Sequence, residues 1–227
     1  MTNAAAANFD LLQWMDGPAR DAFVQCLRPQ RYAAGQTIYL QGDVGREMYR
    51  IASGSVRLSV SRSDGREVIF LLFEPGDCFG ESSLVDDGPR PQTAQAMTDV
   101  ELQVLDTPAY RRLREGFRAF DDALLHLLAR QMRFVSSRYT DLSFNDLRAR
   151  IAARILEAAQ SIGDAGKGGL WLTVPLPQSE IASMVGASRQ SVNRALQRLQ
   201  AEELIATEYH GILIKDVDGL RRLLAQD

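Results

Sequence analysis

The feature that most constrains this chain is the stretch from Phe117 to Ile162, which contains neither glycine nor proline. It is rich in Ala, Leu, Arg and Gln, all of which favour the α-helix. A stretch of this length must hold more than one helix, and we place the break at 143–146, where Asn and Asp side chains can cap the following helix. Gly163 and the run 166–169 are expected to end the second helix and begin a loop.

Large apolar residues repeat along the first of these helices with alternating spacings of three and four. They form an a/d seam of about two and a half heptads, which predicts one apolar stripe on one side of the helix. A second stripe, made by Leu124, Leu127 and Phe134, faces elsewhere. Two stripes need two burial partners, so we expect a β domain to cover one and a second copy of the chain to cover the other; packing of both within one chain is the alternative. The seam residues are Leu125, Leu128, Met132, Val135, Tyr139 and Leu142.

From Gln30 to Leu105, short runs rich in Val, Ile, Leu, Tyr and Phe alternate with glycine-containing breaks. This pattern is typical of an antiparallel sandwich or roll. Residues 48–52 and 56–60 flank Ser53-Gly54 and predict one hairpin, and Asp64-Gly65 predicts a second.

The segment 178–199 has the spacing of a helix-turn-helix. Ala182 is small where two helices would cross, and Gly186 lies where the turn needs an unhindered backbone. Val192, Ala195 and Leu199 repeat on the face of the second helix that we expect to be buried. A hairpin from 204 to 215, with its turn near His210-Gly211, follows directly and predicts a winged variant.

The opposite face of the second helix combines guanidinium, carboxamide and hydroxyl groups, and no acidic residue lies between 186 and 200. Arg, Gln and Asn are the residue types that form bidentate contacts with guanine and adenine edges in the major groove. Residues 145–227 carry ten basic and ten acidic side chains, so one copy would bind DNA weakly and a second half-site is needed. The predicted DNA-binding residues are Ser188, Arg189, Gln190, Asn193 and Arg194.

Composition excludes several other classes of protein. The chain has 227 residues and a formal net charge of -3, so it is not a general polycation. Two cysteines cannot build a disulfide framework, and the apolar runs are too short to span a membrane. The first eight residues carry no basic export signal, which predicts a cytoplasmic protein. His126 and His210 share no segment with a nucleophile or a carboxylate pair, so we do not expect an enzyme.

The glycine-punctuated β-roll, the long seam helix and the segment Val-Gly-Ala-Ser-Arg-Gln-Ser-Val-Asn-Arg at 185–194 resemble one family over nearly the whole chain. This is the cyclic-AMP receptor protein and fumarate-nitrate regulator (CRP/FNR) family of bacterial transcription factors. Arg189, Gln190 and Arg194 fall on the three positions that read bases in that family, where glutamate is common at the position of Gln190. The resemblance implies a ligand-sensing roll, a dimerising helix and a palindromic operator.

The segment 79–84 resembles the start of the family's phosphate-binding cassette, which implies that Glu81 accepts a hydrogen bond from a ribose hydroxyl. The family's cassette ends in Arg-Ser-Ala or Arg-Thr-Ala, whereas this chain has Gln92 at the arginine position, and Arg90 is out of register unless the loop bends. Val135 and Ser136 fall where the cyclic-AMP receptor protein has Thr-Ser against adenine, and valine cannot make the hydrogen bond of threonine. Both departures predict weak binding of cyclic AMP. The implied ligand residues are Gly80, Glu81, Ser82, Ser83, Arg90, Gln92, Thr93, Val135 and Ser136.

We therefore expect an α+β protein with three parts: a cyclic-nucleotide-binding-like antiparallel β-roll (1–116), a dimerisation helix (117–144) and a winged helix-turn-helix (145–227). It is predicted to be a ligand-responsive regulator that acts as a homodimer on double-stranded DNA, with RNA polymerase as a further partner. The expected effector is a small molecule or a cyclic nucleotide, cyclic di-GMP included, and no metal site is predicted. The alternatives are a ligand-independent regulator of the same fold and a cyclic-nucleotide-binding regulatory subunit.

Overall fold

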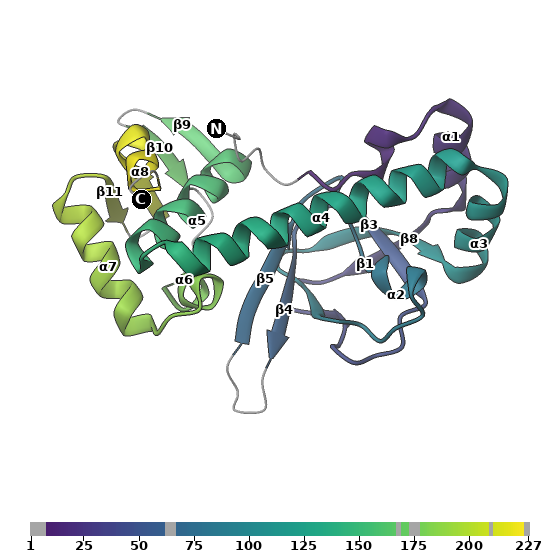
Figure 1. Ribbon diagram of the computed structural model, residues 1–227, viewed down its shortest axis with the longest axis horizontal. Helices are drawn as coiled ribbons and strands as arrows, with labels where there is room; N and C mark the ends of the chain where they lie inside the picture. The colour runs from purple at the N-terminus through teal and green to yellow at the C-terminus, as the bar shows by residue number, and fades with distance from the viewer. Residues whose placement is uncertain (1–7, 62–66, 167–168, 173–177, 209–210, 225–227) are drawn as a thin grey trace. The chain divides into compact units, whose positions relative to one another are not determined.

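A computed structural model describes residues 8–61, 67–166, 169–172, 178–208 and 211–224. The chain forms two compact units, one over Asn8–Arg133 and one that begins at Phe134, and each is described by itself. The boundary between the units falls within the long helix α4 (Arg118–Phe144), which Figure 1 shows as one continuous element. The division into three functional parts at 117 and 145 stays a prediction.

Two four-stranded sheets, in which every strand pair is antiparallel, form the first unit. The strand order is β1-β8-β3-β6 in one sheet and β2-β7-β4-β5 in the other. This arrangement confirms the predicted antiparallel roll. The strands are β1 (Arg28–Tyr32), β2 (Thr37–Tyr39), β3 (Glu47–Ser53), β4 (Val56–Ser61), β5 (Glu67–Phe73), β6 (Cys78–Phe79), β7 (Thr93–Ala96) and β8 (Val100–Asp106).

One of the two predicted hairpins is wrong. Strands β3 and β4 follow each other in sequence but belong to different sheets, so the chain crosses between sheets at 53–54. Gly54 has φ +83°, and a Cβ there would lie 2.3 Å from the Asp99 carbonyl oxygen, so only glycine allows this crossing. A turn signal shows where a chain reverses but does not show which strands share hydrogen bonds. The second hairpin is confirmed, because β4 pairs with β5, for example Leu58 with Leu71, while its turn lies outside the described residues.

Four short helices of this unit were not anticipated from the hydrophobic pattern. The last of them begins at Thr107, directly after Asp106. The Asp106 carboxylate accepts from the Ala109 N–H at 2.9 Å, and a proline lies in the first turn of the helix. Such a cap followed by proline is a helix-start signal that the sequence contained. The helices are η1 (Leu11–Trp14), α1 (Gly17–Cys26), α2 (Ser82–Val85) and α3 (Thr107–Gly116).

The two apolar stripes of α4 have different surroundings. Leu124 and Leu127 are buried and Phe134 is half-buried, whereas most of the seam stripe faces solvent in the single chain. The exposed fractions reach 64% for Leu125, 67% for Met132 and 73% for Tyr139. Within the described residues, no helix has the length and hydropathy that crossing a bilayer requires.

The predicted break between two helices is confirmed: α4 ends at Phe144 and α5 (Leu147–Ile162) follows. The Asp146 carboxylate accepts from the Ala149 N–H at 2.8 Å, which is the expected cap. The expectation of a loop after α5 is wrong over Gly163–Gly166, which form strand β9 against β10 (Gly169–Leu172). Pairing with a neighbouring strand has overridden the low strand propensity of glycine.

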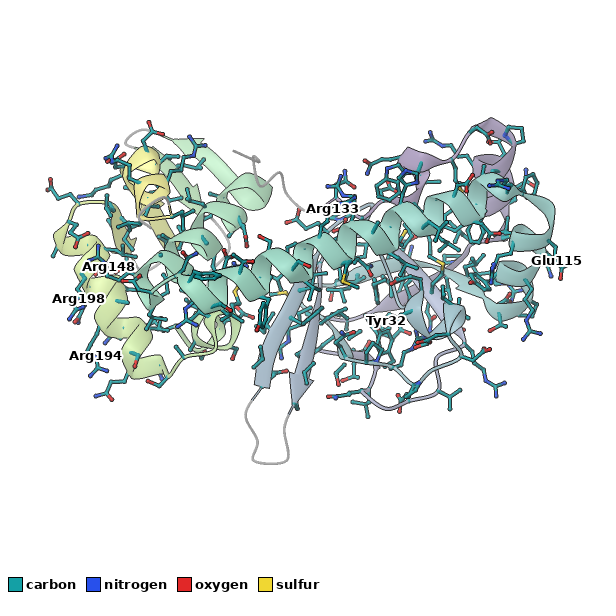
Figure 2. The ribbon with its side chains drawn as sticks, in the orientation of Figure 1. Tyr32, Glu115, Arg133, Arg148, Arg194 and Arg198 are labelled. Carbon is teal, nitrogen blue, oxygen red and sulfur yellow. The ribbon has the colours of Figure 1, made fainter. Side chains whose placement is uncertain are left out.

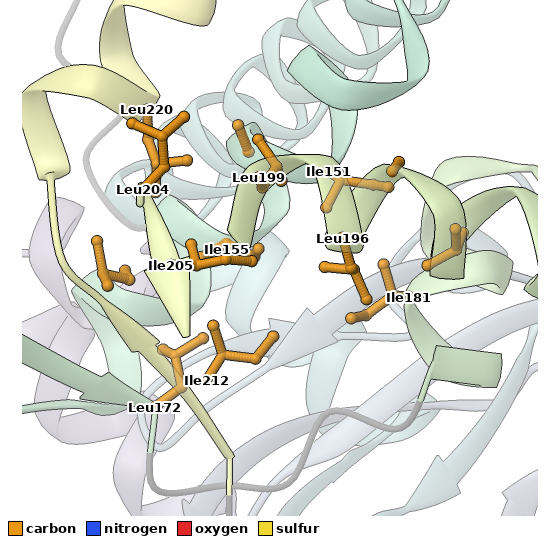
Figure 3. Packing of buried hydrophobic residues seen from close by; sticks show 14 of the residues in the cluster. Ile151, Ile155, Leu172, Ile181, Leu196, Leu199, Leu204, Ile205, Ile212 and Leu220 are labelled. Atoms are coloured by element: carbon orange, nitrogen blue, oxygen red, sulfur yellow. The ribbon is translucent and has the colours of Figure 1, made fainter. Parts of the chain in front are cut away.

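The rest of the second unit matches the predicted winged helix-turn-helix, with one additional helix at its end. Its sheet has the order β11-β12-β10-β9, and the turn predicted near His210 lies outside the described part of the chain. Side chains from α5, both helices of the motif and the sheet meet in one core, part of which Figure 3 shows around Ile155, Leu199 and Ile212. The elements are α6 (Gln178–Val185), α7 (Arg189–Ala201), β11 (Ile205–Glu208), β12 (Gly211–Ile214) and α8 (Val217–Leu223).

A cluster of four charged side chains joins the last turns of α4 to α5. Arg154 is buried and donates to the Asp141 carboxylate at 2.7 Å and to the Glu157 carboxylate at 3.0 Å. Arg138 forms a second ion pair with Glu157. Desolvation raises the pKa of both carboxyls, and the positive charge of Arg138 acts in the opposite direction.

Replacing Arg154 with methionine is expected to lower the free energy of unfolding by about 3 kcal/mol, because it leaves the Asp141 carboxylate partly buried without its cation. The matched control is Arg221→Met, which breaks a 3.2 Å ion pair between two exposed side chains and should cost less than about 1 kcal/mol. Urea unfolding followed by circular dichroism measures both. Equal losses of unfolding free energy in the two variants would show that the buried cluster contributes no more to stability than an exposed ion pair does.

Candidate functional site

The turn of the helix-turn-helix is held by backbone geometry and one serine. Gly186 has φ +62° with open space around it, so glycine is needed there for its conformation and not for room. The N–H of Ala187 donates to the carbonyl oxygen of Ala182 at 3.0 Å, which closes α6. Ser188 then caps α7, because its hydroxyl oxygen accepts from the N–H of Ser191 at 3.1 Å.

The two faces of α7 divide as the sequence predicted. Val192, Ala195 and Leu199 are buried in the core of the second unit. The opposite face exposes arginines, and Figure 2 shows Arg194 and Arg198 pointing away from the helix. In the part of the chain that the structure describes, none of the arginines of α7 is paired with a carboxylate, which leaves their positive charges available to a polyanion.

The five predicted DNA-binding residues are not equivalent in the structure. Arg189 and Gln190 are exposed at the start of α7. The hydroxyl of Ser188 is used by the cap, and the Arg194 guanidinium donates to Ser191 Oγ at 3.3 Å. The carboxamide oxygen of Asn193 accepts from Gln178 Nε2 at 3.2 Å.

Gln178, at the start of α6, was missed because no spacing rule marks a hydrogen bond between two helices. Within the described ranges, Arg189 and Gln190 have free functional groups, whereas the other three predicted residues are engaged by hydrogen bonds within the protein.

Arg90 is a buried guanidinium in the first unit, with 3% of its surface exposed. Its Nη1 donates to the carbonyl oxygen of Gly80 at 2.6 Å and its Nη2 to that of Glu47 at 2.7 Å. The loop before β7 therefore bends, which is the condition under which the sequence allowed Arg90 to reach the cassette. The sequence left open whether Arg90 reaches the cassette, because register along the sequence cannot show how a loop folds back.

Backbone hydrogen bonds explain this bend. The N–H of Arg90 donates to the Asp43 carbonyl oxygen and the N–H of Gly42 donates to the Arg90 carbonyl oxygen, both at 2.8 Å. An isolated bridge between Val44 and Pro89 extends the same pairing. These hydrogen bonds hold the cassette loop against the turn after β2, and the side chain of Arg90 points into the protein.

Three buried polar atoms around Arg90 have no hydrogen-bond partner within the described residues: Glu81 Oε2, Ser83 Oγ and Arg90 Nε. Leaving one such group unsatisfied costs roughly 1–3 kcal/mol. A Cβ placed on Gly45 would lie 2.6 Å from Ser83 Oγ and 3.0 Å from the Arg90 guanidinium carbon, so these two side chains border the same backbone. Buried polar groups without hydrogen-bond partners are rare in proteins. Three of them close together indicate a site where a polar ligand would supply the missing hydrogen bonds.

The charges at this site are opposite and close enough to interact. Burial raises the pKa of the Glu81 carboxyl, while a hydrogen bond from Gln131 on α4 and the Arg90 charge act in the opposite direction. The site therefore offers a donor for an anionic oxygen beside an acceptor for a hydroxyl. That pairing suits a phosphate next to a sugar hydroxyl.

The other predicted ligand residues lie at different places. Ser82 starts α2, and the Thr93 hydroxyl accepts from the Gln41 N–H at 3.0 Å at the edge of β7. Gln92 is half-buried and makes no side-chain hydrogen bond in the described ranges. Val135 and Ser136 are exposed on α4 in the second unit, so their role towards a base stays a prediction.

Comparisons with known proteins match one domain in each of the two units. Residues 29–116 match the cyclic nucleotide-binding domain, and residues 149–223 match the Crp-like helix-turn-helix domain. A "CRP-like cAMP-activated global transcriptional regulator" of Mycobacterium tuberculosis is 35% identical over 216 residues, which cover 95% of this chain and 96% of that protein. The transcriptional regulator LdrP of Thermus thermophilus is 37% identical over 198 residues, covering 85% of this chain and 95% of LdrP.

A solved structure gives the same result for the fold. The crystal structure of a CRP-family transcriptional regulator from Thermus thermophilus superimposes with a TM-score of 0.73 at 34% identity, covering 87% of this chain and 97% of that one. Sequence, domain order and fold thus agree along most of the chain. The chain belongs to the CRP/FNR family of transcriptional regulators.

Proposed function

We propose that this regulator binds palindromic DNA as a homodimer through α7 and that an anionic cyclic nucleotide bound at Glu81, Ser83 and Arg90 controls it. The main support for a ligand at this place is the group of three buried polar atoms that have no hydrogen-bond partner among the described residues. We place RNA polymerase as the further partner and the cytoplasm as the site of action, since a transcriptional regulator acts where the promoter is.

The uncovered seam of α4 supports the homodimer. Each large apolar side chain left in water forgoes about 1.5 to 3 kcal/mol of burial energy. The six residues of the seam share a stripe with the spacing that two helices use to pack against each other, and the exposed members lie along most of α4. A second copy supplies the same stripe, so one symmetric contact covers both.

The recognition face supports sequence-specific binding. Arg189 and Arg194 lie five residues apart and Gln190 lies four before Arg194, so at about 100° per residue all three can enter one major groove. Arginine suits guanine O6 and N7, whereas glutamine accepts from cytosine or bonds to adenine and discriminates less sharply. A dimer presents two such faces, which fits a palindrome.

Cyclic AMP is the first ligand to test. The Arg90 guanidinium removes one of the two sequence arguments for weak binding, and the relative from Mycobacterium tuberculosis is named as cAMP-activated. The other argument, valine at position 135, still predicts a poorer contact with adenine than threonine would give. Cyclic GMP and cyclic di-GMP are the competing ligands, and a regulator that works without any ligand is the second candidate.

The dimer is tested by Met132→Lys, which places a charge in the middle of the seam. Sedimentation at micromolar concentration is expected to show a dimer for the unmodified protein and a monomer for the variant. Ser137→Lys, an exposed change on the same helix away from the seam, should remain a dimer. A monomeric unmodified protein contradicts the proposal.

DNA reading is tested by selecting binding sites from a random library. Arg189→Ala should cost about 1–3 kcal/mol per half-site and relax one base position, and Gln190→Glu should sharpen the neighbouring position. Arg221→Ala, on α8, is the control and should leave the selected sequence unchanged. An unchanged preference in both α7 variants would mean that the helix docks in another way.

The ligand site is tested by calorimetric titration with the three cyclic nucleotides. Arg90→Gln is expected to weaken the best ligand roughly 10- to 100-fold, because it removes a charged hydrogen-bond donor. Gln92→Ala should change the affinity little. The reverse result would place Gln92, and not Arg90, on the phosphate.

A further inference from the structure

Aromatic rings border the buried guanidinium of Arg90. Its central carbon lies 4.3 Å from the centroid of the Tyr39 ring and 5.7 Å from that of Tyr49. The two rings stack on each other, with centroids 5.9 Å apart and planes inclined by 29°. Both distances are within the range of cation–π attraction, which strengthens when water is excluded. Tyr39 is therefore the closer of two neutral surfaces that stabilise this charge.

The remaining surroundings constrain the guanidinium on two sides. Its two terminal nitrogens donate to the carbonyl oxygens of Gly80 and Glu47. A Cβ on Gly80 would lie 2.8 Å from Arg90 Nη1, and a Cβ on Gly45 would lie 3.0 Å from its guanidinium carbon. Backbone thus approaches the group at both glycines, which leaves no space for an alternative position on those sides.

One edge of the guanidinium is left over. Arg90 Nε has no hydrogen-bond partner among the described residues, although it is buried. A planar guanidinium can offer an edge to an anion only while its plane is held, and a flat ring against one face does this at little entropic cost. A tyrosine hydroxyl is neutral at physiological pH, and burial raises the pKa of the Tyr39 hydroxyl further.

We infer that Tyr39 is a positioning residue of the ligand site, which holds the Arg90 guanidinium so that its free edge meets the anionic group of the ligand. This inference rests on the proposed function. Tyr39 does not touch the ligand, and its effect on affinity passes through Arg90. The ring face carries the effect and the hydroxyl does not.

Tyr39 is also a core residue, since its ring packs near Phe79 at 6.2 Å, so the test must separate positioning from packing. A double-mutant cycle does this. Tyr39→Leu is expected to weaken cyclic AMP binding about tenfold in the unmodified protein and not at all in the Arg90→Gln background. Tyr39→Phe keeps the ring and should bind as the unmodified protein does.

The matched control is Phe73→Leu, a buried ring that stacks on Phe79 at 5.5 Å without contacting Arg90. It should lower the thermal midpoint as Tyr39→Leu does, yet leave the affinity for cyclic AMP unchanged. An equal loss of affinity from Tyr39→Leu in both backgrounds, or a loss from Phe73→Leu as large, would show that Tyr39 acts by packing alone and overturn the inference.

The two proposals fail in different ways. If cyclic AMP binds and the cycle shows no coupling, the role of Tyr39 is rejected while the ligand site stands. If none of the three cyclic nucleotides binds, the same cycle is measured as thermal stabilisation by inorganic phosphate. Stabilisation that depends on Tyr39 only when Arg90 is present supports the inference without a nucleotide, and its absence rejects both proposals.

Discussion

Burial of the Arg90 guanidinium is the constraint on which the architecture of the first unit depends. Taking a cation out of water costs several kcal/mol unless the protein replaces the lost hydration. Here two backbone carbonyls, two tyrosine rings and a nearby carboxylate do so, and they come from the ends of β2, β3 and β6. These strands belong to both sheets, so the site exists only once the roll has assembled.

The same arrangement supports the proposed ligand site. The replacement of water is incomplete, because Glu81 Oε2, Ser83 Oγ and Arg90 Nε remain without partners within the described chain. A ligand that supplies both an acceptor and a hydroxyl recovers energy that the protein alone leaves unrecovered. Such a ligand binds the folded state and stabilises it, so occupancy and the stability of the roll are linked.

Helix α4 gives the protein its second organising element. Leu124 and Leu127 fix its first half in the core of the first unit, and the cluster around Arg154 fixes its last turns to α5. Most of the seam, which runs along the helix from Leu125 to Leu142, is exposed in the single chain. One continuous helix thus contributes Gln131, beside Glu81, to the first unit and packs against α5 in the second.

The periodicity of apolar residues and local backbone preferences predicted much of the fold. The glycine- and proline-free stretch predicted two helices with a capped break, and the spacing around Gly186 predicted the helix-turn-helix, because both depend on neighbours a few residues apart. The stripe that faces solvent and the stripe that is buried on α4 also followed from a repeat of three and four. Local patterns failed where pairing partners are distant. Strands β3 and β4 looked like a hairpin but belong to different sheets, and 163–166 looked like a loop but pair as a strand.

The sequence by itself determined the family, the order of the domains and the exposed face of α7, because each depends on the types and spacing of residues that are close together in the chain. Only the tertiary structure decided which residue supplies the guanidinium of the proposed ligand site. Counting along the cassette placed Gln92 there, whereas hydrogen bonds to the turn at 42–43 bend the loop and bury Arg90 instead. The guanidinium of Arg90 donates to the Glu47 carbonyl oxygen, 43 residues away along the chain, and no local pattern contains such a contact. A buried charge is placed by the partners that surround it in space.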